Sequence, residues 1–209
     1  MGFFSTGKTQ QPRTTDKVWK TREACLKGIV REALLSIKNG EQPIIMIFFE
    51  ESQVQLAEFL GKMSVPCHIV GDYGLSGIAD VRNAIVVVNA FSQTGSGNAL
   101  RPDTKTSLFF LGHYPRVATE TSLVEKFMSL FHASQAVFCQ SLEDPVFEVF
   151  GNDRLRPMMK TLGMTEDECI EHAMVTRALR RALEKINQSI ETEVKSSSEK
   201  EWFARNVKR

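Results

Sequence analysis

Pro43-Ile44-Ile45-Met46-Ile47-Phe48-Phe49 is a continuous apolar run. Successive side chains of a strand point to opposite faces of its sheet, so a strand without polar residues is buried on both faces. The run is far shorter than the roughly 20 apolar residues that a membrane-spanning helix needs. We therefore expect a strand here that is covered on both sides.

Helical spacing flanks this strand. Upstream, apolar residues recur with a helical period from Val18 to about Lys38, and Asn39-Gly40 ends the pattern. Downstream, the segment from Ser52 to Met63 has the same spacing. The chain thus alternates between helix and strand around its most apolar segment.

The alternation continues along the chain. Another amphipathic helix is predicted over Leu123–Phe131, before the last of four further short strands. Strands that alternate with helices indicate an open α/β sheet with mostly parallel strands. The four strand segments are Cys67–Val70, Ala84–Val88, Ser107–Leu111 and Ala136–Cys139.

The pattern changes after Gln140. Residues 144–196 contain only helix signals, with one element ended by Gly163 and a long helix expected from about Ile170 to Ile190. Three serines at 196–198 then break the helical pattern. For the short amphipathic tail that follows, with Trp202 and Phe203, we expect a solvated end, because short isolated helices are marginal in water.

Composition excludes several functional classes. The chain has 209 residues, of which 42% are hydrophobic and 24% charged, values typical of a soluble globular protein. A formal net charge of +1 gives no general attraction to nucleic acid or to an anionic membrane. No apolar run is long enough to span a bilayer, and polar residues directly follow Phe3-Phe4, so we expect no secretory signal.

The cysteines and histidines do not form a metal-binding motif. The cysteines lack any C-x-x-C pairing, and adjacent residues of a strand such as Cys67 and His68 point to opposite faces. We therefore expect no metal site and four reduced, buried thiols, as in a cytosolic protein. The four cysteines are Cys25, Cys67, Cys139 and Cys169, and the four histidines, which are equally scattered, are His68, His113, His132 and His172.

The first residues, MGFFSTGKTQQP, fit two motifs. Gly2 to Thr9 match the phosphate-loop pattern G-x-x-x-x-G-K-[ST], but no strand precedes Gly2 and Pro12 interrupts the helix that should follow. Gly2 with Thr6 also matches the pattern for N-terminal myristoylation, which needs only an accessible glycine. We expect a polar, disordered lead over residues 1–16 and leave acylation of Gly2 open.

One stretch resembles a known family. It begins Ser141-Leu-Glu-Asp-Pro-Val-Phe-Glu-Val-Phe-Gly-Asn-Asp-Arg-Leu, continues as Met159-Lys-Thr-Leu-Gly-Met, and ends with Ile170-Glu-His-Ala-Met-Val-Thr-Arg-Ala. In order, spacing and identity these segments resemble SecA, the ATP-driven preprotein translocation motor, where the second motor domain meets the scaffold helix. Gln42-Pro43 with the apolar run, and Leu56–Val70, resemble the start of the same domain.

The resemblance implies a fold and a domain division. The second motor domain of SecA is RecA-like, so we expect a RecA-like, mostly parallel sheet flanked by helices, with an all-helical C-terminal extension. The similarity covers roughly 18–190, and the chain corresponds to half of a motor, without the first motor domain. The division expected is a lead over 1–16, a degenerate motor domain over 17–143, a helical extension over 144–196 and a tail over 197–209.

The sequence departs from the family at its catalytic motifs. Where SecA has A-G-R-G-T-D, this chain has Thr94-Gly95-Ser96-Gly97-Asn98-Ala99, which keeps only the two glycines as a weak nucleotide signal. The family's Q-x-x-G-R-[AS]-G-R helix corresponds to a segment from Leu123 that has neither arginine nor glycine. Because loss of an arginine finger alone costs about 10³–10⁵ in rate, we expect no catalytic residues and no ATPase activity.

The replacement residues on this helix are apolar. Phe127, Met128, Leu130 and Phe131 stand where the family has residues that face nucleotide and the other motor half. They predict either a new protein-binding surface or a helix that simply packs on the sheet.

The leading hypothesis is a non-catalytic adaptor or scaffold that binds other proteins in a transport or secretion system. Two alternatives remain: a nucleotide-binding regulatory domain or motor half acting in trans through Gly95 and Gly97, and a peripheral membrane protein held through Gly2. We expect no cofactor, no nucleic-acid partner and a cytoplasmic location with at most peripheral membrane contact. The expected partners are components or substrates of a secretion or translocation machine.

His172 lies at the start of the scaffold-helix resemblance. There we expect a locally hydrogen-bonded, structural side chain rather than a catalytic one.

Overall fold

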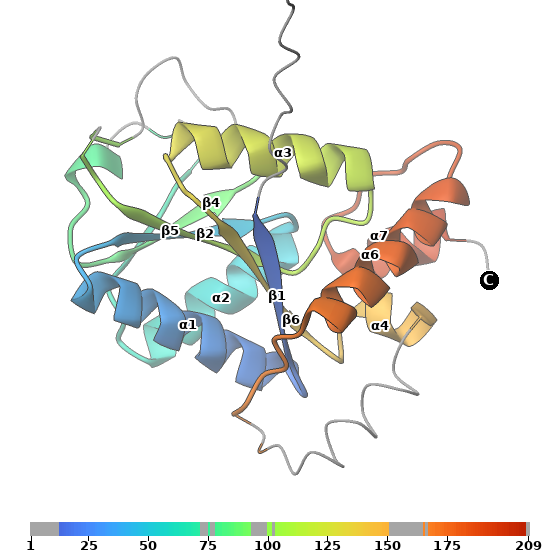
Figure 1. Ribbon diagram of the computed structural model, residues 1–209, viewed down its shortest axis with the longest axis horizontal. Helices are drawn as coiled ribbons and strands as arrows, with labels where there is room; N and C mark the ends of the chain where they lie inside the picture. Colours follow the sequence, from blue (N-terminus) through green and yellow to red (C-terminus); the bar gives the residue numbers. More distant parts are fainter. Residues whose placement is uncertain are drawn as a thin grey trace, which may run out of the picture.

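The computed structural model describes residues 13–71, 75, 78–92, 100–101, 103–150, 165 and 167–207. Within these residues the chain forms a sheet with helices on both faces (Figure 1). The strands are β1 Thr14–Trp19, β2 Gln42–Ile47, β3 Cys67–Ile69, β4 Ile85–Asn89, β5 Thr106–Leu111 and β6 Ala136–Ser141. The helices are α1 Arg22–Lys38, α2 Glu50–Lys62, η1 Ile78–Asp80, α3 Val117–Leu130, α4 Pro145–Phe150, α6 Ala173–Gln188 and α7 Glu199–Asn206.

The described strands form one sheet in the order β1-β6-β5-β2-β4-β3. All of its strand pairs are parallel, with β2 paired on one side with β4 and on the other with β5. Parallel pairs need crossover connections, and α1, α2 and α3 each lie in one of these connections. The prediction of a RecA-like, mostly parallel sheet flanked by helices is confirmed.

The apolar run in β2 is buried on both faces, as expected. Ile44 and Met46 belong to the core on the side of α3 and α6, whereas Ile45 and Ile47 belong to the core on the side of α1 and α2. All four side chains are fully buried. The strand therefore joins two hydrophobic layers, which explains why it tolerates no polar residue.

The beginning of the chain differs from the prediction. Residues 14–16 of the expected lead and Val18 of the expected helix belong to β1, which pairs with β6 in register Thr14↔Ala136 to Trp19↔Ser141. The first helix begins only at Arg22, because the Thr21 hydroxyl caps it by accepting a hydrogen bond from the Ala24 amide at 3.1 Å. Pairing with β6 thus makes Val18 part of a strand, although the spacing of apolar residues favours a helix there.

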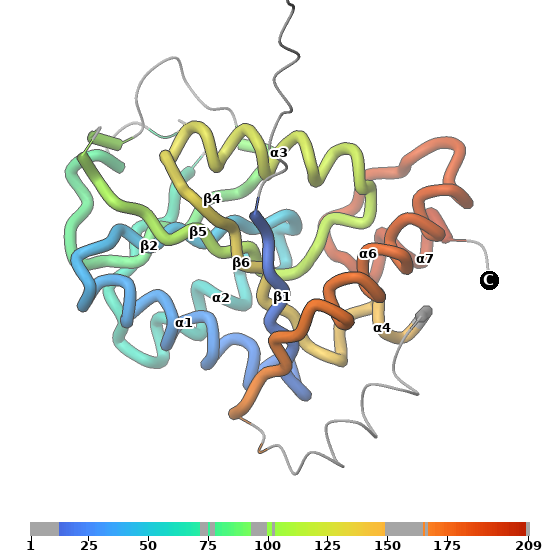
Figure 2. The backbone as a smooth tube through the Cα atoms, in the orientation of Figure 1, coloured from blue at the N-terminus to red at the C-terminus, as the bar shows by residue number. Residues whose placement is uncertain are grey.

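The helical extension contains one β-bridge as well as helices. Ile170 forms an isolated antiparallel bridge with Val18, through backbone hydrogen bonds of 3.0 and 2.9 Å. The long helix predicted from about Ile170 to Ile190 is observed as α6, Ala173–Gln188. It lies beside β1 (Figure 2). Gly163 lies outside the described residues.

The tail is part of the core, which corrects the expectation of a solvated end. Trp202 of α7 is fully buried, and Phe203 is nearly so. Ser198 caps α7 by accepting a hydrogen bond from the Glu201 amide at 3.1 Å. Tertiary burial therefore stabilises a helix of 8 residues that would be marginal alone. None of the helices in the described part of the chain is long and apolar enough to cross a membrane.

Candidate functional site

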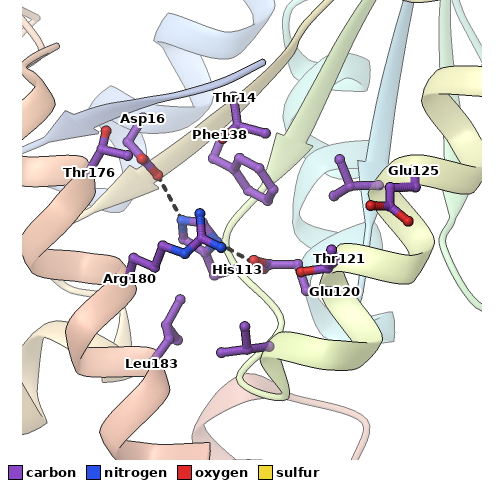
Figure 3. Close-up of a pocket in the computed structure, with 12 residues that line it drawn as sticks. Thr14, Asp16, His113, Glu120, Thr121, Glu125, Phe138, Thr176, Arg180 and Leu183 are labelled. Atoms are coloured by element: carbon purple, nitrogen blue, oxygen red, sulfur yellow. Dashed lines mark hydrogen bonds and ion pairs between the residues drawn. The ribbon is translucent and has the colours of Figure 1, made fainter. Parts of the chain in front are cut away.

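A cavity of about 130 Å³ lies between the sheet, α3 and α6 (Figure 3). Its volume approaches that of an engineered cavity that admits benzene. Charged and apolar side chains share its wall, and two of the charged ones, Asp16 and Glu120, point to the ring of His113 (Figure 3). The lining residues are Thr14, Asp16, His113, Val117, Glu120, Thr121, Val124, Glu125, Phe138, Thr176, Arg180 and Leu183.

The His113 ring is held between two carboxylates. Its Nε2 lies 2.7 Å from Oδ1 of Asp16, and its Nδ1 lies 2.8 Å from Oε2 of Glu120. The ring stacks on Phe138 with centroids 4.2 Å apart. A carboxylate accepts hydrogen bonds, so both ring nitrogens donate and His113 is an imidazolium.

The electrostatics agree with this geometry. Burial opposes the charge on His113, but Glu120 and Asp16 prevail and raise its pKa to about 10. Burial likewise opposes ionisation of Asp16, yet hydrogen bonds from His113, Thr176 and Gln140, together with the imidazolium charge, lower its pKa. The three groups form an ionised cluster with a net charge of about −1.

This cluster connects separate elements rather than offering a reactive group. Asp16 is in β1, Glu120 is in α3, and Thr176 in α6 contributes a hydrogen bond to Asp16. Gln140 of β6 donates to the same Asp16 oxygen at 2.8 Å. An imidazolium with both nitrogens occupied has no lone pair, so His113 is not a general base in this state. The arrangement fixes α3 and α6 against the sheet.

The carboxyl edge of the sheet is the place where open α/β proteins bind ligands. In this chain the segment before α7 reaches that edge and caps α2. The carbonyl of Ser197 accepts a hydrogen bond from the Glu51 amide at 3.1 Å, and Glu50 and Glu51 occupy the first turn of α2. A carbonyl and two carboxylates at a helix N-terminus disfavour a bound phosphate.

Aromatic rings fill the same edge. The Tyr114 ring lies 5.0 Å from Phe91 and 6.3 Å from Trp202, centroid to centroid. Glu193 accepts a hydrogen bond from the Tyr114 hydroxyl and another, at 2.8 Å, from Nε1 of Trp202. Arg116 donates to the Ile190 carbonyl at 3.2 Å. Residues 190–207, called here the covering segment, are therefore attached to this edge through both polar and aromatic contacts.

A hollow of about 370 Å³ remains beside the covering segment. Its cations are Lys195, whose Nζ lies 5.9 Å from the centroid of the Phe91 ring, and Arg205, which forms an ion pair with Glu201. Glu50 and Glu201 also line it. The mixture of charges gives no preference for a polyanion.

The chain is similar to curated SecA proteins. The chain is 24% identical to a protein translocase subunit SecA from Halothermothrix orenii over 185 residues, which are 82% of this chain and 21% of that protein. It is 29% identical to the SecA subunit of Campylobacter curvus over 184 residues, again 82% of this chain and 21% of that protein. The chain resembles a fragment of SecA. It spans about a fifth of the length of these curated relatives. No protein-family model matches the chain.

The SecA-like segment that begins at Ser141 has a structural role in this fold. Asp144 accepts hydrogen bonds from the Ser141 amide at 3.0 Å and from its hydroxyl at 2.7 Å. The guanidinium of Arg22 lies 3.5 Å from Asp144 and donates to the Ser52 hydroxyl at 3.1 Å. Glu143 accepts from the Arg22 amide at 2.8 Å. These bonds join the ends of β6, α1 and α2.

The apolar residues predicted as a partner surface on α3 lie mainly in the core. Phe127 and Phe131 are fully buried and stack on each other at 5.8 Å. Met128 and Leu130 are half-buried and pack against the same cluster. Phe127 and Phe131 therefore pack in the core beneath α3, and a role of this helix in binding a partner stays a prediction.

The remaining predicted positions have mixed outcomes. Gly2, Gly95 and Gly97 lie outside the described residues. The local hydrogen bond expected of His172 is confirmed, since its Nδ1 accepts from the Met174 amide at 3.1 Å and caps α6.

The cysteines were predicted only in part. Cys25 and Cys139 are buried as expected, and Cys169 is half-buried, but Cys67 is exposed because β3 is an edge strand. Within the described ranges, no group of three histidine, cysteine or acidic residues could hold a metal ion.

Sequence reasoning did not find the His113 cluster. Asp16 and His113 are 97 positions apart, and Gln140 and Asp16 are 124 apart. The only local signal is the spacing of 7 between His113 and Glu120, across the turn into α3.

Proposed function

We propose that this chain is a protein-binding module of a protein transport or secretion system, derived from a SecA-like motor domain and without ATPase activity of its own. The similarity to translocase subunits supports the link to transport. The sequence supports the lack of catalysis, because the segment from Leu123 to Ser134 has no arginine to stabilise charge on a phosphoryl group.

The observation that carries the proposal is the occupied carboxyl edge of the sheet. There the Ser197 carbonyl takes the α2 amide of Glu51, and Trp202 fills the space in front of Tyr114. A nucleotide needs exposed amides and cations at such an edge. In the described part of this edge the covering segment occupies that position, and the hollow that remains has lining charges of both signs, so we place the useful surface of this module elsewhere.

Calorimetric titration of the full chain with Mg-ATP tests the absence of nucleotide chemistry. We expect no binding heat up to about 1 mM nucleotide. Any binding would then have a free energy weaker than about −4 kcal/mol. We also expect no phosphate release above the buffer rate. Micromolar binding together with hydrolysis would favour the regulatory-domain alternative and overturn the proposal.

Affinity purification from the native cell, with quantitative mass spectrometry, tests the protein-binding part. We expect enrichment of transport components or of exported precursors over a tagged unrelated domain. Enrichment of none of these would contradict the proposed role even if ATP does not bind.

A further inference from the structure

A groove of about 230 Å³ runs between α1 and α2, on the face of the sheet opposite the His113 cluster. Figure 1 shows the two helices next to each other below the sheet. The α1 side contributes both apolar and basic residues, and the α2 side is apolar. The lining residues are Lys27, Val30, Arg31, Leu34, Leu35, Lys38, Phe59 and Met63.

The apolar part of the groove is exposed to an unusual degree for core-facing helices. Leu35 is 46% exposed and Met63 is 56% exposed, whereas Val30, which also lines the groove, is buried. Phe59 and Leu34 are half-buried and pack on the α1–α2 core. The groove thus presents exposed apolar side chains beside a buried apolar floor, which is the kind of surface that a partner could cover.

The charged part of the groove has one sign. Lys27, Arg31 and Lys38 line it from α1, and no acidic side chain is among the lining residues that the structure describes. Lys27 also pairs with Glu23 one turn away, at 2.8 Å. The rim is therefore basic along one side and uncharged along the other, where Phe59 and Met63 lie.

We propose that this groove binds an amphipathic helical segment of a partner protein, whose apolar residues enter between Leu35 and Met63 and whose acidic residues face Arg31 and Lys38. The proposal rests on the proposed function, since it names the surface by which the module binds protein. A helix laid in a groove presents apolar anchors at i, i+3, i+4 and i+7. Charge complementarity selects an acidic flank.

Two other occupants fit the groove less well. A second copy of the chain, paired about a two-fold axis, would bring the same basic rims together, and like charges disfavour that contact. A bilayer needs apolar side chains that protrude beyond the cations. Among the lining residues, Leu35 and Met63 are the exposed apolar side chains, whereas Val30 is only 3% exposed and Phe59 is half-buried, so little apolar surface protrudes beyond the cations.

Fluorescence polarisation tests the proposal with a labelled peptide of about 18 residues, long enough for a few helical turns. The peptide carries leucines on one face and glutamates beside them. Matched peptides replace the glutamates by lysines or the leucines by serines. The chain variants are Arg31→Glu with Lys38→Glu, and Leu35→Asp with Met63→Asp. The controls are Lys105→Glu and Val54→Asp, because both residues lie outside the groove lining, Lys105 is an exposed lysine and Val54 is 56% exposed.

We expect the acidic amphipathic peptide to bind the parent chain and both controls, with affinity lowered at least about tenfold by either groove double variant. The lysine and serine peptides should bind at least about tenfold more weakly. Circular dichroism and thermal unfolding show whether each double variant is folded, and the peptide controls test the claim without any variant.

Three results would overturn the proposal: no binding of the acidic peptide to the parent chain, binding that the groove variants leave unchanged, or groove-dependent dimerisation or binding to anionic vesicles instead. These results do not test the proposed function, which has its own experiment. If a native partner were captured equally well by the parent chain and by the groove variants, the groove would be refuted as the binding site, and the proposed function would still stand.

Discussion

At the scale of single residues, His113 makes a specific contribution to stability. Its pKa is raised from 6.5 to about 10 by the surrounding carboxylates, against the effect of burial. A raised pKa in the folded state adds stability that is complete below pH 6.5 and is lost as the pH rises towards 10. The lowered pKa of Asp16 has the opposite window, since its contribution is present above pH 3.8 and is lost in acid.

We predict that His113→Gln lowers the free energy of unfolding by about 3 kcal/mol near neutral pH, because the buried carboxylate of Asp16 and the half-buried carboxylate of Glu120 lose their cation. The difference from the parent should shrink as the pH rises from 7 to 10. Urea unfolding at several pH values measures it. His68→Gln, at an exposed position of β3, is the control and should follow the parent. A constant difference across this range would contradict the imidazolium assignment.

Gly28 shows a conflict between helix propensity and packing. A Cβ at this position would lie 2.3 Å from the Trp19 ring, which is fully buried. Alanine normally stabilises a helix interior by about 1 kcal/mol relative to glycine. Overpacking a buried ring costs about 1–3 kcal/mol.

Gly28→Ala should therefore lower the melting temperature. Gly61→Ala in α2, where nothing lies within 4 Å of the added carbon, should raise it or leave it unchanged. Differential scanning calorimetry of the two variants compares them directly. Equal shifts in the same direction would show that Trp19 moves aside without cost.

At the scale of elements, α6 depends on the residue that precedes it, its N-cap His172. His172 is exposed, and its ring accepts the hydrogen bond that caps the helix. His172→Ala should cost about 0.5–2 kcal/mol, the usual range for a lost N-cap. His172→Asn should retain most of the stability, because asparagine is a favoured cap. Thermal unfolding gives both values, and binding of a partner by the folded fraction should not change.

Local patterns predicted most elements and missed those that depend on distant pairing. The run from Pro43 to Phe49 is apolar at every position, so its sequence alone indicates a strand buried on both faces. By contrast, β1 offers only Val18 and Trp19 as apolar residues, and its pairing with β6 spans most of the chain. Its Asp16 is buried only because His113 and Gln140 satisfy it. The spacing of apolar residues within β1 cannot predict hydrogen bonds to partners so far away in the sequence.

The site was predictable to a smaller extent than the fold. The sequence showed that arginines are missing near Leu123, but not that Phe127 and Phe131 are buried, since an amphipathic helix does not reveal which apolar residues reach the core. The groove between α1 and α2 was also invisible. It depends on how two helices, separated by β2, lie against each other.

At the scale of the whole molecule, the covering segment lies over part of the carboxyl edge of the sheet. Glu193 is central to this closure because it accepts hydrogen bonds from both Tyr114 and Trp202. Removing it leaves two donors without that acceptor at a part-buried site, and each unsatisfied buried donor costs about 1–3 kcal/mol. The sheet itself keeps all of its strand pairing, so the loss should be local.

We therefore predict that Glu193→Ala accelerates amide hydrogen exchange in residues 190–207 at least about tenfold, while β2 stays as protected as in the parent, because exchange reports local opening separately from global unfolding. Glu191→Ala, two residues away and exposed, is the matched control and should exchange like the parent. If exchange in β2 rose together with that of the covering segment, the segment would belong to the folding core rather than form a separable cover. Unchanged exchange in both regions would mean that the aromatic contacts of Trp202 hold the edge closed without Glu193.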